Sequence, residues 1–129
     1  MGLFKAKARH PLAGLTARTL KQGTQIPLIE VEPDFIDFVR QTRPRQPKLG
    51  HEAPIALIAE GGDVIAYYDD HRVGRMEPRA ASYYADEFAT LTRRKQFGVT
   101  TVFIKPEGAK SPHAISLNWG RGAVGGGIL

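Results

Sequence analysis

The stretch VIAYYDDHRVGRM, residues 64–76, decides the fold of this chain. Residues 64–68 are β-branched, small or aromatic, which favours a strand, and the polar residues 69–72 favour a turn. Residues 73–76 return as a second strand, so the stretch is predicted to be a β-hairpin. A helix is expected directly after it, because Pro78 suits a first helical turn and apolar residues recur three and four positions apart up to Leu91.

Three further strands are expected on either side of this hairpin and helix. Residues 55–59 (IALIA) precede the hairpin as an apolar run of strand length. Residues 99–104 are rich in β-branched side chains, and residues 114–119 alternate between apolar and polar. The order predicts an α+β fold, namely a small five-stranded, mostly antiparallel β-barrel or curved sheet with one covering helix.

The domain organisation follows from the distribution of proline, glycine and basic residues. Residues 54–119 are expected to form the compact domain. Residues 1–53 read as a basic N-terminal arm and Pro-containing linker, with a short strand at 26–31 and a short helix near 34–40. Pro27 suggests an edge position for that strand. Residues 120–129 are expected to be a flexible Gly-rich tail.

The overall composition narrows the class of protein. The chain has 129 residues and a net charge of +5, a balance that favours anionic partners such as nucleic acid. It has no cysteine, which excludes disulfides and thiolate metal sites. No apolar run is long enough for a signal peptide or a membrane span. We therefore expect a cytoplasmic protein that makes no contact with membranes.

No motif for catalysis or cofactor binding stands out. The histidines (His10, His51, His71 and His113) do not lie at metal-ligand spacing. No GxSxG occurs, and a loose GxGxxG lies only in the tail, without the strand before it and helix after it that phosphate binding requires. Asp69 and Asp70 suit a turn better than an acid pair. We expect no catalytic residue, no metal, no cofactor and no small-molecule substrate, and hence a protein that is not an enzyme.

The basic and aromatic residues around the hairpin carry the functional prediction. Two adjacent tyrosines end its first strand, and one of them should point outward because successive strand residues face opposite sides. Arginines flank its return strand, where Val73 and Arg75 are expected on the same face. Outward rings with neighbouring cations are typical of single-stranded nucleic acid binding, although a buried tyrosine and a solvated arginine face would give the same pattern. The expected nucleic-acid contacts are Tyr67, Tyr68, Arg72, Arg75, Arg79, Lys105 and Lys110.

Residues 55–119 also resemble the HIRAN domain, a module of some DNA-repair helicases that occurs as a stand-alone protein in bacteria. The resemblance rests on the strands IALIAE and VIAYY, the polar turn DDHR and the step from Val73 to Met76 that opens into the helix. It implies a small β-barrel with a helix and, as in helicase-linked members, binding of single-stranded DNA ends. The family's Asn-Pro-x-Asp-like loop is here Glu60-Gly61-Gly62-Asp63, without the proline and the aromatic, and only Asp63 echoes its acidic residue.

Two functions follow from this reading. The first is a non-enzymatic nucleic-acid-binding module that contacts single-stranded or frayed DNA. The alternative is a protein-interaction or self-assembly module whose basic surface serves solubility only. In that case the apolar segments at residues 26–31 and 33–39 would dock onto a partner or form a homo-oligomer by exchange of the arm.

Overall fold

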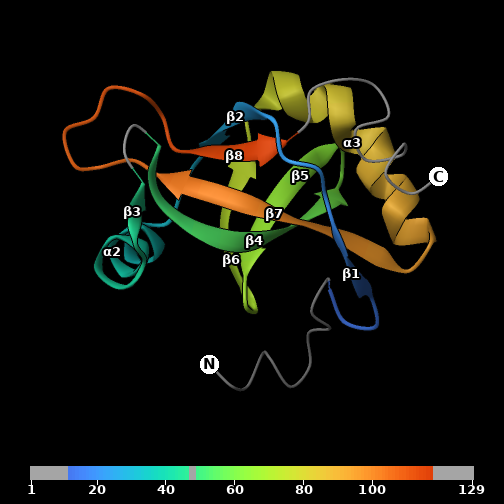
Figure 1. Ribbon diagram of the computed structural model, residues 1–129. Helices are drawn as coiled ribbons and strands as arrows, with labels where there is room; N and C mark the ends of the chain where they lie inside the picture. Colours follow the sequence, from blue (N-terminus) through green and yellow to red (C-terminus); the bar gives the residue numbers. More distant parts are fainter. Residues whose placement is uncertain (1–11, 47–48, 118–129) are drawn as a thin grey trace.

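The computed structural model describes residues 12–46 and 49–117. Two helices and eight strands follow one another in this part of the chain (Figure 1). They are β1 (Thr16–Thr19), β2 (Thr24–Ile29), α2 (Pro33–Thr42), β3 (Arg45–Gln46), β4 (Gly50–Glu60), β5 (Asp63–Tyr68), β6 (His71–Met76), α3 (Pro78–Arg93), β7 (Gln96–Ile104) and β8 (Ala114–Leu117).

Six of the strands close into an antiparallel barrel. Its order is β7-β8-β2-β6-β5-β4, and β4 pairs back with β7 from His51 opposite Ile104 to Leu57 opposite Gly98. Outside this ring, β1 runs parallel to the first half of β7 and β3 pairs with the start of β4. Closure gives each of the six ring strands a paired neighbour on both sides, so none of them is an edge strand along its whole length.

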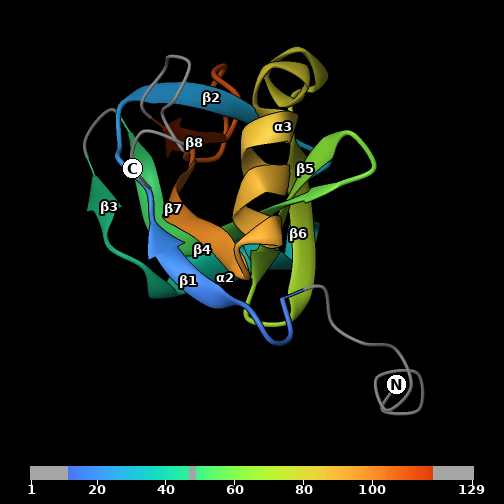
Figure 2. The same ribbon diagram turned by 90° about the vertical axis from the view of Figure 1, so that its right-hand side faces the viewer.

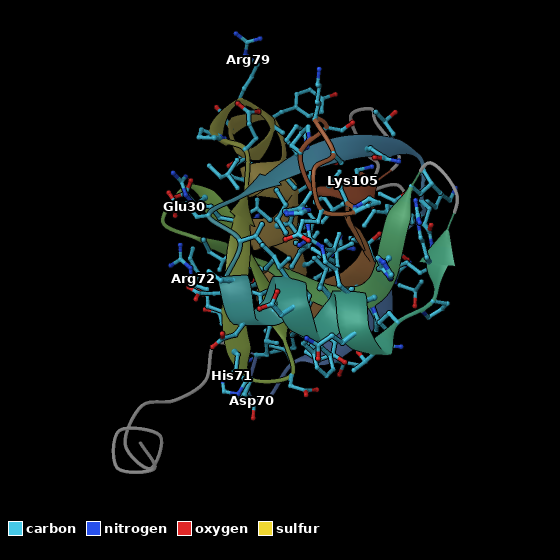
Figure 3. All side chains as sticks on the ribbon, turned by 90° about the vertical axis from the view of Figure 1, so that its left-hand side faces the viewer. Glu30, Asp70, His71, Arg72, Arg79 and Lys105 are labelled. Carbon is cyan, nitrogen blue, oxygen red and sulfur yellow. The ribbon has the colours of Figure 1, made fainter. Side chains whose placement is uncertain are left out.

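A helix lies across each end of the barrel. In the view of Figure 2 α3 is in front, and in the view from the other side in Figure 3 α2 is in front. Pro78 opens α3, and the Glu77 side chain caps it by accepting from the Ala80 amide at 3.1 Å. Neither helix in the described ranges is long and apolar enough to cross a membrane.

The main core fills the barrel between the two helices. Tyr84, Phe88 and Leu91 of α3 enter it from one end, and Phe35 and Val39 of α2 enter it from the other. Their three- and four-residue spacing places them on one face of each helix. The predicted amphipathic helix after the hairpin is therefore confirmed, and the second helix covers the opposite opening.

The prediction of a small α+β barrel is confirmed, but the ring has one strand more than the five predicted. Each of the five matches one of β4 to β8, and the sixth is β2, which lies between β8 and β6. Pro27 does not place β2 at an edge. It stands where the pairing changes from β8 to β6, and its carbonyl accepts from the Glu77 amide at 3.0 Å, so its missing N–H breaks no ladder at mid-strand.

The predicted boundary at residue 53 does not separate two structural units. Ile26 and Leu28, assigned to the N-terminal arm, are 1% and 2% exposed in the barrel core. The short helix predicted near residues 34–40 is present as α2, and it packs onto the same barrel. Long-range pairing thus draws the described part of the arm into the domain. Its first residues and the Gly-rich tail lie outside the described residues. A homo-oligomer formed by exchange of the N-terminal arm stays a prediction.

Candidate nucleic-acid interface

A groove of about 460 Å³ lies between the first half of α2 and the turn of the β5–β6 hairpin. We call it the aromatic groove. It forms because closure of the barrel carries the hairpin turn to the end that α2 covers (Figures 1 and 3). Its walls are Glu32, Asp34, Phe35, Phe38, Tyr68, Asp69, His71, Arg72 and Val73.

Three aromatic rings line one wall of the aromatic groove. Tyr68 packs against Phe35 and Phe38 with ring centroids 5.3 and 5.4 Å apart. Phe35 is buried, whereas Phe38 is 41% exposed and is one of two large apolar side chains that are exposed in the described chain. The Tyr68 hydroxyl accepts from Arg43 Nη2 at 3.1 Å. The rings are tilted by 47° and 54° to Tyr68, so the wall is an apolar surface of inclined rings, and a guanidinium fixes its polar end.

The two adjacent tyrosines occupy different environments. Tyr67 is 7% exposed and belongs to a small cluster with Ile58 and Ile65 on the outer face of the sheet. Its hydroxyl donates to Glu60 Oε2 at 2.7 Å, and burial together with this bond raises the pKa of Tyr67 well above its ordinary value. Tyr68 is half-buried and lines the aromatic groove. Of the pair, only Tyr68 is placed to meet a ligand in that groove.

A β-bulge sets the directions of the side chains on β6. Ala66 lies opposite Gly74, but Tyr67 lies opposite Arg72, so Val73 is the extra residue. As a result Val73 turns into the core and Arg75 turns out, and the prediction that they share a face is wrong. Arg72 remains at the groove, with half of its side chain exposed.

Arg75 is held in an ion-pair network on the outer surface. Its guanidinium lies 3.0 Å from Glu30 and 3.3 Å from Asp63. The hydrogen bond from Arg75 lowers the pKa of Glu30, which keeps the carboxylate charged. The guanidinium of Arg72 lies farther from the Glu30 carboxylate, at 4.0 Å. Arg72 is therefore the less constrained of the two cations.

The other predicted contacts lie away from the aromatic groove. Arg79 is exposed on the first turn of α3 and points away from the hairpin turn, as Figure 3 shows. Lys110 is exposed in the loop between β7 and β8. Lys105 is 6% exposed, and its ammonium donates to Gln25 Oε1 at 2.8 Å. The structure thus brings together Tyr68 and Arg72 and leaves the remaining predicted residues outside their groove.

Carboxylates shape the charge of the aromatic groove. Glu32, Asp34 and Asp69 all line it, against the single guanidinium of Arg72. A run of several phosphates would be repelled there. A base with its phosphates turned toward the arginines fits this distribution better than a backbone laid along the groove.

A second hollow of about 430 Å³ adjoins the aromatic groove, because Tyr68 and Asp69 line both. Arg43 lies on its wall with Pro54 and Phe97. Tyr68 therefore stands between two hollows, each with an aromatic surface and one arginine. An extended ligand could place successive flat groups in the two hollows.

Sequence reasoning missed Phe38 and Arg43 as functional candidates. Both lie in the segment that we read as arm and linker, and the contact with Tyr68 joins residues 25 to 30 positions apart. One signal was present in the sequence. A two-turn helix needs only Phe35 and Val39 for its core face, so Phe38 is a surplus aromatic.

No protein-family model, no curated protein and no solved structure matches this chain. Within residues 12–46 and 49–117, no three His, Asp or Glu side chains are grouped as metal ligands would be. The functional argument therefore rests on the geometry of the site.

Proposed function

We propose that this protein is a non-enzymatic nucleic-acid-binding module of the HIRAN-like kind that holds single-stranded or frayed DNA. The aromatic groove carries this proposal, because Phe38 is exposed beside Tyr68 at the mouth of a small β-barrel. Exposed rings in such a position are surfaces on which nucleobases stack. The volume of about 460 Å³ lies in the range of small-molecule sites and is large enough for a base.

The charges around the aromatic groove favour one orientation of a bound nucleotide. A base stacks on Phe38 in the groove, and the adjoining phosphates approach Arg72 and Arg43 at its two sides. The carboxylates of Asp34 and Asp69 face the base, where a carboxylate can accept from an exocyclic amino group or a hydroxyl. A duplex cannot offer an unstacked base, so unpaired DNA is the preferred ligand.

The proposal is tested by fluorescence anisotropy with short single- and double-stranded oligonucleotides at low salt. Phe38→Ala should weaken single-strand binding by about 5- to 150-fold, since stacking on one aromatic ring contributes about 1–3 kcal/mol. Tyr83→Ala is the matched control, because Tyr83 is the other exposed large aromatic, at 39%, and lies on α3.

Two results would contradict the proposal. One is the absence of binding by the wild-type chain at low salt. The other is an equal loss of affinity in Phe38→Ala and Tyr83→Ala, which would assign the binding to charge alone.

A further inference from the structure

A cluster of basic side chains lies on the other side of α2 from the hairpin turn. Arg40 comes from α2, Lys105 follows the last residue of β7, and His113 precedes β8. In Figure 3 Lys105 lies above α2, whereas Asp70 and His71 lie below it. This cluster is therefore spatially separate from the aromatic groove.

Hydrogen bonds hold the three residues in one arrangement. Arg40 Nε and Nη2 donate to the Lys105 carbonyl at 3.1 and 2.8 Å. The Lys105 amide donates to His113 Nδ1 at 3.0 Å. The Lys105 ammonium reaches Gln25 Oε1 of β2 at 2.8 Å. Lys105 thus joins the end of β7 and the start of β8 to α2 and β2.

The positive charge of the cluster has no counterion within the described residues. The ion pairs of the hairpin region involve Arg72 and Arg75, whereas Arg40 and Lys105 pair with no carboxylate in the described ranges. Burial lowers the pKa of Lys105, and burial followed by the charges of Arg40 and Lys105 lowers the pKa of His113. A cation that is 6% exposed and unneutralised is costly unless an anion joins it.

The cluster also retains unused donors. A guanidinium has five N–H donors and an ammonium three, and the contacts above use two from Arg40 and one from Lys105. Because His113 Nδ1 accepts, the proton of the neutral ring is on Nε2, which is a further donor. The charges of Arg40 and Lys105 both act on the His113 ring, so the donors of the three residues lie near one another.

We propose that Arg40, Lys105 and His113 form a binding site for a phosphate group. A phosphate matches the cluster because its charge offsets the two cations and its oxygens accept from several donors at once, including the planar fork of Arg40. The phosphate comes from inorganic phosphate or from the end of a nucleotide chain. The inference does not rest on the proposed function, because its residues are not those of the aromatic groove.

The test is an NMR titration of the full wild-type chain with inorganic phosphate, compared with chloride at equal ionic strength. Bound phosphate should raise the pKa of His113, because the anion stabilises the imidazolium. The ring signals of His71, on the other side of α2, are the internal control and should not change. An equal response to chloride, or no response at His113, would overturn the inference.

The phosphate affinities of two variants, measured by calorimetry, show whether Lys105 belongs to the site. Lys105→Met keeps the length of the buried chain without its charge and should weaken phosphate binding about tenfold or more, the size of a charge-assisted hydrogen bond. Arg79→Gln removes an exposed arginine on α3 and should bind phosphate like the wild type. Equal affinities of Lys105→Met and the wild type would contradict the assignment.

Two further experiments separate this site from the aromatic groove and identify the source of the phosphate. Phe38→Ala should bind inorganic phosphate normally, which separates failure of this site from failure of the aromatic groove. A short oligonucleotide with a 5′-phosphate, compared with the same sequence without it, shows whether a terminal phosphate occupies the cluster. Tighter binding of the phosphorylated oligonucleotide would assign the site to the end of a nucleotide chain, and equal binding of the two oligonucleotides would assign it to inorganic phosphate.

Discussion

At the residue scale, the neighbours Tyr67 and Tyr68 differ in their surroundings, and we expect stability to depend on the first and the proposed binding on the second. Tyr67 closes the outer cluster, donates to Glu60 and lines only the second hollow, whereas Tyr68 lines both hollows. Tyr67→Phe should lower the free energy of unfolding by about 1 kcal/mol, the net contribution of one hydrogen bond, as measured by urea denaturation. Oligonucleotide affinity should not change. A loss of affinity as large as that of Phe38→Ala would contradict the division of roles.

His113 makes stability depend on pH. Its folded pKa is lowered by burial and by Arg40 of α2 and Lys105 after β7, so the unfolded chain binds the proton more readily. Stability should therefore be complete above the ordinary histidine value of 6.5 and fall as the pH drops from there toward the folded pKa. His113→Asn, whose side-chain oxygen can still accept from the Lys105 amide, should show less of this decline in denaturation curves. Identical pH profiles would contradict the prediction.

At the scale of elements, Gly74 lets β2 and β6 approach closely. A Cβ at this position would lie 3.1 Å from the Ile29 carbonyl oxygen and 3.3 Å from the Leu28 side chain. Gly74→Ala should therefore destabilise the fold by about 1–3 kcal/mol through overpacking, measured by chemical denaturation. Unchanged stability would mean that the β2–β6 junction is looser than its geometry indicates.

Local sequence patterns predicted which helices and strands form better than they predicted which strands pair with one another. The hairpin, the helix α3 and three further strands follow from turn residues and periodicity that lie within a few positions. The barrel position of β2 does not, because Pro27 is tolerated only through the change of partner from β8 to β6. The four residues of β1, three of them polar, pair with β7 about 80 positions away, and no local pattern marks them.

The candidate site shows the same limit. Tyr68 and Arg72 were predictable because both belong to the hairpin, and the resemblance to a known family marked the same stretch. The β-bulge that turns Val73 inward and Arg75 outward was not predicted, although a glycine within a strand, here Gly74, is a signal for a bulge. Phe38, Arg40 and Arg43 reach their positions only because α2 packs across the end of the barrel.

At the scale of the whole molecule, the sequence carries a net charge of +5, whereas three carboxylates and one guanidinium line the aromatic groove. Few phosphates should therefore be neutralised on binding. Arg72→Gln should reduce the slope of log affinity against log salt by about 0.7, the contribution of one phosphate contact on a single strand. Arg79→Gln, which removes an equal charge outside the aromatic groove, should leave the slope unchanged. Equal slopes for wild type and Arg72→Gln would remove Arg72 from the interface.

The central claim is that unpaired DNA binds in the aromatic groove between α2 and the β5–β6 turn. It is tested most directly by titrating the isotope-labelled chain with a short single-stranded oligonucleotide and following backbone amide shifts by NMR. We predict that the largest shifts fall on residues 34–43 and 68–73, with small shifts along α3. Largest shifts on α3 or in the loop between β7 and β8, or no shifts at low salt, would contradict the claim.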